Sequence, residues 1–99
     1  MDVNELITQC TGFQWDEGNL PKIWERHRVS TDECQQLFLN RPLFGAPNEK
    51  HSAEEERYYA FGQTDAGRFL TIIFTVRGDL IRVISARNMN RRERRTWSE

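Results

Sequence analysis

Several residue types and motifs are scarce in this 99-residue chain, and each absence excludes a class of protein. Its two cysteines, Cys10 and Cys34, are too few for a disulfide framework and do not form a C-x-x-C metal pair. Its two histidines, His27 and His51, lack the spacing of a zinc motif, and no acidic run has the spacing of a calcium loop. We therefore expect neither a metal nor a cofactor.

Long hydrophobic runs are missing as well. No stretch approaches the roughly 20 apolar residues of a transmembrane helix, and residues 1–5 lack the positive charge typical of a secretory signal. Hydrophobic residues make up 37% of the chain and charged residues 29%, as in a globular protein. We expect one domain over residues 1–99, located in the cytoplasm, with reduced cysteines.

Lysine is missing from the C-terminal part of the chain, although that part is basic. Residues 1–56 contain eleven acidic and five basic residues, whereas residues 57–99 contain four acidic residues and nine arginines. The planar guanidinium group of arginine binds phosphate and carboxylate in a bidentate manner, which lysine does less well. The pattern predicts a phosphate-binding C-terminal part, and the alternative is a solvated surface that pairs with the acidic part.

Hydrophobic spacing changes from helical to alternating along the chain, which predicts an α+β fold. The first segment is either a short helix or a loosely tied arm, and residues 13–15 form a short extended piece. One helix begins after Asp16 and ends at His27, and a capping box, Ser30 to Glu33, begins a second that ends near Leu39. Three strands follow, and then a short helix capped by Asn90 and Glu93. The expected strands are 57–63, 68–76 and 80–87.

The central strand has one apolar side. Leu70, Ile72, Phe74 and Val76 alternate with Thr71 and Thr75, so the apolar set predicts the core face of the sheet. The helices are expected to cover this face with four residues, Ile23, Trp24, Leu37 and Phe38. Cys34 lies on the apolar side of its helix and is expected to pack in the core.

Four arginines in or beside the strands are candidates for binding a charged ligand: Arg57, Arg68, Arg82 and Arg87. Burying an arginine among β-branched residues is costly unless it is paired or lies on a functional face. Arg87 falls on the other side of its strand from Arg82, unless a bulge intervenes. The alternative to a functional cluster is a set of ion pairs, with Glu54, Glu55, Glu56 and Asp79 as partners.

The order of several short motifs resembles the BrnT toxin family, over about residues 13–97. The motifs are Trp-Asp-Glu-Gly-Asn at 15–19, Arg-His-Arg-Val-Ser at 26–30, Glu-Arg-Tyr at 56–58, Gly62, Gly-Arg at 67–68, Ile-Arg-Val-Ile-Ser-Ala-Arg at 81–87 and Arg-Glu-Arg-Arg at 92–95. Three positions depart from the family pattern. Arg28 stands where glycine is usual, which predicts a different turn between the first two helices; Ile23 stands where asparagine is frequent, and Asn48 where aspartate is common.

The resemblance implies a RelE-like fold, in which two N-terminal helices and a C-terminal helix pack on a small antiparallel sheet. It also implies a bacterial ribonuclease toxin of a type II toxin–antitoxin system, which arrests translation. The implied partners are RNA and a DNA-binding, BrnA-like antitoxin that is usually encoded immediately downstream, in a hetero-oligomeric complex. The alternatives are an inactive toxin that serves only antitoxin binding and autoregulation, and a plain RNA-binding module.

Cleavage of RNA without a metal requires cations, a proton acceptor and a proton donor near the 2′-OH and its phosphate. The four strand arginines would supply the cations. His27, His51, Glu56 and Glu93 are candidates for the acid and base, and His27 and Glu56 rank first because the family motifs include both. The helix arginines Arg91, Arg92, Arg94 and Arg95 are expected to bind RNA and to be covered by the antitoxin. Trp97 is either an antitoxin anchor or a residue that packs back onto the sheet with Met89.

Overall fold

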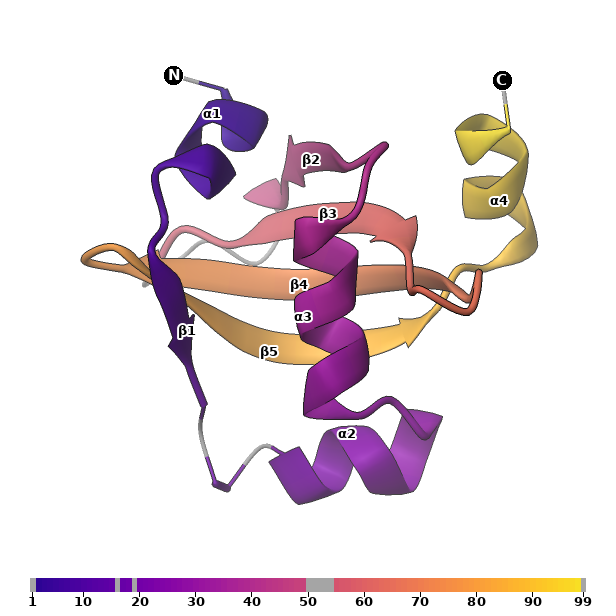
Figure 1. Ribbon diagram of the computed structural model, residues 1–99, viewed down its shortest axis with the longest axis horizontal. Helices are drawn as coiled ribbons and strands as arrows, with labels where there is room; N and C mark the ends of the chain where they lie inside the picture. Colours follow the sequence, from indigo (N-terminus) through magenta and orange to yellow (C-terminus); the bar gives the residue numbers. More distant parts are fainter. Residues whose placement is uncertain (1, 16, 19, 50–54, 99) are drawn as a thin grey trace.

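The structure is a computed structural model that describes residues 2–15, 17–18, 20–49 and 55–98. In this part of the chain five strands form one sheet in the order β1-β5-β4-β3-β2 (Figure 1). The strands are β1 (Gly12–Gln14), β2 (Phe44–Pro47), β3 (Tyr58–Gln63), β4 (Phe69–Arg77) and β5 (Leu80–Asn88). Four helices accompany them: α1 (Val3–Thr8), α2 (Leu20–His27), α3 (Thr31–Leu39) and α4 (Arg91–Trp97). The expected α+β class is confirmed.

The sheet is mixed rather than wholly antiparallel. Strands β2 to β5 pair antiparallel, as expected, but β1 pairs parallel with β5. Just before β1, the backbone N–H of Thr11 donates to the Asp79 carbonyl at 2.8 Å, and the Thr11 hydroxyl donates to the Asp79 carboxylate at 2.7 Å. Because Asp79 immediately precedes β5, both strands start at the same end of the sheet and run in the same direction.

Local capping explains where the helices begin. The backbone N–H of Glu33 donates to the Ser30 hydroxyl at 3.1 Å, and the Glu33 carboxylate accepts from the Ser30 N–H at 3.1 Å, so the predicted capping box begins α3. Asn90 and Glu93 form the same motif at the start of α4. The first segment is a helix, α1, capped by Asp2. Asp16 lies outside the described residues, and the predicted start of the helix directly after it was wrong, because residues 17–18 form a turn and α2 begins at Leu20.

The turn between α2 and α3 has the geometry of a left-handed helix cap. Arg28 follows the last residue of α2 and has a φ of 52°, in the region that favours glycine. Its N–H donates to the Trp24 carbonyl at 2.9 Å, as in a single-bond left-handed cap. Arginine therefore takes here the backbone conformation for which glycine is best suited.

The core lies between the sheet and the helices α1, α2 and α3. Leu70, Ile72 and Phe74 of β4 are completely buried, which confirms the predicted core face, and Leu37 of α3 packs against them as part of the same cluster. Gly62 of β3 permits this approach, because a Cβ atom there would lie 3.0 Å from the Leu37 side chain.

The prediction that Trp24 lies in the core was wrong. Trp24 is 48% exposed, and the Arg28 guanidinium lies 5.4 Å from the centre of its ring. Helix α2 lies along the margin of the sheet beside β5, so its buried contact is made by Ile23. Trp24 is about 100° further round the helix and points to solvent. The other three predicted helix residues, Ile23, Leu37 and Phe38, are buried as expected.

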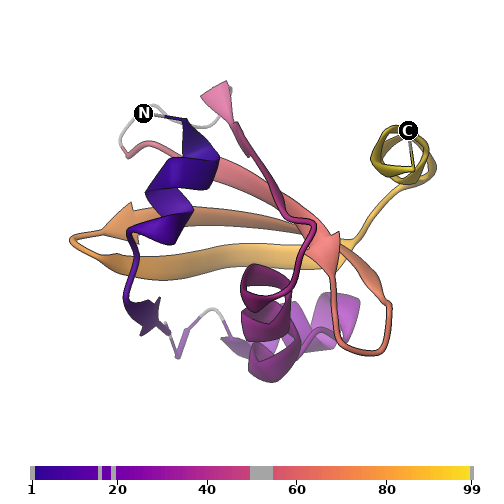
Figure 2. The same ribbon diagram turned by 45° about the horizontal axis from the view of Figure 1, so that its top comes forward.

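The opposite side of the sheet, which we call the open face, is covered by neither α2 nor α3. Figure 2 shows these helices on one side of the sheet, with α4 standing apart near the end of β5. By strand register, the open face includes Phe44, Ala46, Tyr59, Phe61, Thr71, Ile73, Thr75, Arg82, Ser85 and Arg87. No residue of α4 is buried.

Among the described residues, no helix has the length and apolar character needed to cross a membrane.

Candidate functional site

A bulge in β5 brings two of the predicted arginines to the open face. Ile73 pairs with Ser85, but its neighbour Phe74 pairs with Val83, so Ile84 is an extra residue in β5. The extra residue reverses the alternation of the side chains along the strand. Arg82 therefore lies opposite Thr75 and Arg87 opposite Thr71, all on one face. The sequence allowed Arg82 and Arg87 to share a face only if a bulge lay between them, and that bulge is present.

Arg87 forms the most extensive polar contact on this face. Its Nη1 lies 2.7 Å from Oε1 of Glu93, and its Nη2 lies 3.0 Å from Oε2 of the same carboxylate. The buried Thr71 hydroxyl also donates to Glu93, at 2.9 Å, and so does the backbone N–H of Asn90. These contacts join β4, β5 and the first turn of α4 at one carboxylate.

The electrostatics of this cluster keep both partners ionised. Burial tends to raise the pKa of Glu93, but hydrogen bonds from Arg87, Asn90 and Thr71 outweigh it, so the pKa is lowered. The hydrogen bond with Glu93 raises the pKa of Arg87, in spite of partial burial, and the nearby Tyr59 adds to this effect. The cluster holds a charged carboxylate, which can accept a proton, against a cation that can bind a phosphate.

Arg57 and Arg82 lie toward the other end of the open face, near the backbone carbonyl of Glu56. The Thr75 hydroxyl donates to the Glu56 carbonyl at 2.7 Å, which covers Thr75 and explains why a threonine opposite the core is buried. A hydrogen bond from Arg77 lowers the pKa of Glu55, and the charges of Arg82 and Arg57 lower it further. Arg82 and Arg57 are therefore close enough to Glu55 for their charges to lower its pKa.

The carboxylate of Glu56, a predicted acid or base, is engaged with a neighbouring tyrosine. It accepts a hydrogen bond of 2.7 Å from the Tyr58 hydroxyl. Burial and this contact raise the pKa of Tyr58 to about 12, so the hydroxyl stays protonated and remains a donor. Glu56 is exposed and lies two residues before the start of β3.

Arg68 and His27 meet on the helix-covered side of the sheet. The Arg68 guanidinium donates to the His27 carbonyl at 2.8 Å and to the Arg28 carbonyl at 2.7 Å, both at the end of α2. It also forms a salt bridge of 3.0 Å with Glu33 and donates to Asn88 at 2.8 Å. Arg68 thus ties α2, α3, β4 and the end of β5 together. It does not join the arginines of the open face.

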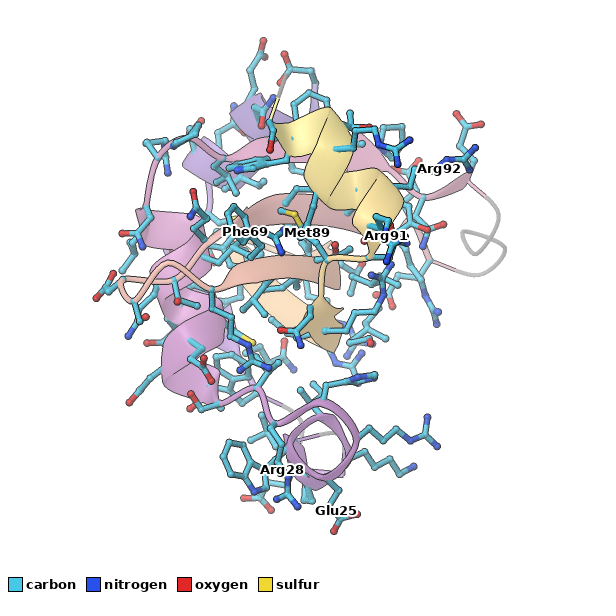
Figure 3. All side chains as sticks on the ribbon, turned by 90° about the vertical axis from the view of Figure 1, so that its right-hand side faces the viewer. Glu25, Arg28, Phe69, Met89, Arg91 and Arg92 are labelled. Carbon is cyan, nitrogen blue, oxygen red and sulfur yellow. The ribbon has the colours of Figure 1, made fainter. Side chains whose placement is uncertain are left out.

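The arginines of α4 are exposed, and one of them holds the helix to the sheet. The Arg94 guanidinium lies 4.3 Å from the centre of the Phe69 ring. Figure 3 shows Phe69 and Met89 beneath α4, with Arg91 and Arg92 on its first turn. A depression of about 430 Å³ lies beside the helix. Its lining residues are Met89, Arg91, Arg94, Arg95 and Ser98. Trp97 is half-buried and outside the core cluster.

Three aromatic residues on the open face were missed by the sequence analysis: Phe44, Tyr59 and Phe61. The signal was present in β3, where Tyr59 and Phe61 alternate with Tyr58, Ala60 and Gly62. Thr71 was expected only to lie opposite the core, and its contact with Glu93 depends on the position of α4.

His51, another predicted acid or base, lies outside the described residues. In the described part of the chain, no three His, Cys, Asp or Glu side chains are grouped to hold a metal ion.

A family model matches most of the chain. Residues 15–93 match the family model described as "Ribonuclease toxin, BrnT, of type II toxin-antitoxin system". Among solved structures, the chain is similar to the crystal structure of the Brucella abortus ribonuclease toxin BrnT, with a TM-score of 0.62 and 24% sequence identity over 82% of this chain and 99% of that chain. This likeness shows a common fold. None of the curated proteins searched matches the sequence.

Proposed function

The chain belongs to the BrnT family of ribonuclease toxins of type II toxin–antitoxin systems, and we propose that it cleaves RNA on the open face of its sheet without a metal ion. The observation that carries this proposal is the cluster of Arg87, Glu93 and Thr71, in which a cation and an ionised carboxylate meet on an arginine-rich face. When it is free in the cytoplasm, the toxin would stop translation by cleaving RNA.

The proposed reaction uses the 2′-OH of the substrate as the nucleophile. The 2′-OH loses its proton, its oxygen bonds to the adjacent phosphorus, the P–O5′ bond breaks and the 5′ oxygen takes a proton. Glu93 is our candidate for accepting the first proton, because its carboxylate lies on the open face in direct contact with Arg87 and Thr71. Arg87, with Arg82 and Arg57 further along the face, would stabilise the negative charge that develops on the phosphate.

This assignment revises the ranking made from the family motifs. His27 and Arg68 contact each other on the helix-covered side, so we assign them a structural role and not a place in the reaction. Glu56 remains a candidate proton donor or acceptor, because it is exposed and adjoins Arg57 in the sequence, although its carboxylate is bonded to Tyr58. The arginines of α4 would bind the RNA strand where it leaves the cluster.

The proposed partner is a DNA-binding, BrnA-like antitoxin in a hetero-oligomeric complex. It would cover α4 and the neighbouring sheet, because an active ribonuclease must be blocked in the resting cell. We also propose that residues 1–99 form a single RelE-like domain.

An alternative is a protein that binds RNA or the antitoxin without cleaving RNA. The specific observation in its favour is the bidentate pair itself, since both terminal nitrogens of Arg87 are occupied by Glu93. A substrate phosphate would have to take over at least one of these contacts before Arg87 could assist the reaction.

The test is cleavage of single-stranded RNA by the purified chain, produced by cell-free synthesis, in excess chelator. We expect products that end in a 2′,3′-cyclic phosphate, and an Arg87→Ala variant that is slower by about 10²- to 10³-fold. Arg26→Ala, an exposed arginine on α2, is the matched control and should cleave at the wild-type rate. Activity that requires a divalent ion would exclude the metal-free reaction, and RNA binding without cleavage would support the alternative.

A further inference from the structure

Three aromatic rings form a continuous strip on the open face, next to the Arg87 cluster. Phe44 of β2 lies directly opposite Phe61 of β3, with ring centres 6.3 Å apart. Tyr59, two residues before Phe61, stacks on it with ring centres 5.6 Å apart and planes 24° from parallel. We call Phe44, Phe61 and Tyr59 the aromatic strip.

Core packing does not account for this strip. The neighbouring Tyr58 packs against Phe74 in the core cluster, whereas no ring of the strip belongs to that cluster. Phe44 is 56% exposed, and Tyr59 and Phe61 are half-buried. Large apolar side chains that gather on an exposed face usually mark a binding surface.

The strip lies in register with the charged cluster. Phe44, Phe61, Thr71 and Arg87 form one row across β2, β3, β4 and β5. Because neighbouring strands are about 4.8 Å apart, Phe61 and Arg87 are separated by about 10 Å along this row. Tyr59 lies in the next row and is close enough to Arg87 to contribute to the raised pKa of its guanidinium.

An aromatic surface beside arginines matches the chemistry of single-stranded nucleic acid. Bases stack on aromatic rings irrespective of their sequence, and the phosphates are bound by cations. The described residues 55–98 contain nine arginines and five acidic residues, so the charge complements a polyanion. An apolar protein segment would fit the rings equally well, but it would not use the neighbouring cations.

We infer that the aromatic strip is a stacking platform for unpaired bases of the RNA, next to the phosphate that is cleaved. This inference rests on the proposed function, since it assigns the bases of the same substrate to Phe44, Phe61 and Tyr59. It implies that the enzyme prefers single-stranded RNA, because bases in a duplex are not available to stack on protein side chains.

The test measures binding of a fluorescent single-stranded oligonucleotide with 2′-O-methyl groups, which cannot be cleaved. Phe44→Leu and Phe61→Leu should each weaken binding by about tenfold, because one stacked base is worth roughly 1–3 kcal/mol. Tyr59→Phe keeps the ring and should bind like the wild type. Trp24→Leu removes an exposed ring from the helix-covered side and is the matched control.

A second probe separates base stacking from charge. An abasic oligonucleotide of the same length keeps the phosphates but offers no bases, so the leucine variants should bind it as well as the wild type does. Thermal unfolding of each variant identifies any loss of affinity that comes from misfolding, and Phe44→Leu is the safer variant because Phe44 is so exposed.

Three outcomes would overturn the inference, and they are distinguishable from one another. If both leucine variants bind RNA normally while Arg87→Ala does not, the platform is wrong but the proposed function stands. If the leucine variants bind RNA normally but lose affinity for the antitoxin, the strip is a protein-binding surface. If the wild-type chain neither binds nor cleaves RNA, the proposed function fails, and the platform fails with it.

Discussion

Arg87 of β5 and Glu93 of α4 form a bidentate ion pair, with N···O distances of 2.7 and 3.0 Å. This pair, together with the contact of Arg94 on Phe69, holds a helix that buries none of its residues. A fixed pair of this kind gives defined geometry as well as charge. The position of α4 and the state of the proposed active cluster are therefore linked through one carboxylate.

Removal of Arg68 should destabilise the fold. Arg68→Ala removes the guanidinium that donates to the carbonyls at the end of α2 and pairs with the Glu33 carboxylate, which should cost about 2 kcal/mol in the free energy of unfolding. Arg68→Lys should recover little, because an ammonium group lacks the planar set of donors. Denaturant unfolding measures both. Arg77→Ala breaks an exposed pair with Glu55 and should change stability by less than about 1 kcal/mol; an equal loss in the two alanine variants would contradict the structural role of Arg68.

Glycine should be preferred to alanine at position 28. Arg28 has a positive φ, and a Cβ atom in that conformation costs roughly 1–2 kcal/mol. Arg28→Gly and Arg28→Ala both lose the contact with Trp24, so they differ chiefly in the Cβ atom. We expect the glycine variant to be the more stable by about 1 kcal/mol in thermal unfolding. Equal stability would mean that the turn relaxes to another backbone conformation.

Acid should destabilise the protein partly through Glu93. Its folded-state pKa is lowered, so its contribution to stability is present above the unfolded pKa of about 4.5 and is lost as the pH falls through the folded pKa. The stability of Glu93→Gln should therefore depend less on pH below about 4.5 than that of the wild type. Unfolding measured from pH 7 to pH 3 checks this. Parallel curves for the two proteins would show that Glu93 does not carry the effect.

Binding of RNA should weaken steeply with salt. Each neutralised phosphate of a single strand contributes about −0.7 to the slope of log K against log salt concentration. If Arg82 contacts one phosphate, Arg82→Ala should reduce the magnitude of the slope by about 0.7, while Arg26→Ala leaves it unchanged. Arg87→Lys keeps the charge but should still slow cleavage, because the bidentate geometry is lost. A slope near zero for the wild type would refute phosphate binding on this face.

Trp97 should matter more for the antitoxin than for the fold. It is half-buried on a helix that buries none of its residues, so Trp97→Ala should cost clearly less than the 3–5 kcal/mol typical of a core tryptophan. As an interface anchor it should contribute at least about 1 kcal/mol, which is a loss of affinity of roughly fivefold or more. Met89→Ala truncates a buried residue and should give the opposite pattern. An unchanged melting temperature with unchanged antitoxin affinity would exclude both roles of Trp97.

The sequence by itself determined the features that depend on neighbouring residues. The capping box of Ser30 and Glu33 predicts where α3 begins, because both groups lie within one helical turn. The alternation of Leu70, Ile72 and Phe74 with threonines predicts the core face, because side chains in a strand point alternately to its two sides. The arginine-rich C-terminal part and the family resemblance were readable in the same way.

Only the tertiary structure decided which of the arginines act together. The bulge at Ile84 is defined by the pairing of β5 with β4, and without it Arg87 would face the core side. Arg68 was grouped with the other strand arginines by its residue type, but its partners come from α2, α3 and β5, which are far away in sequence. Contacts of that kind depend on how the elements pack, and a local pattern of residues contains no record of them.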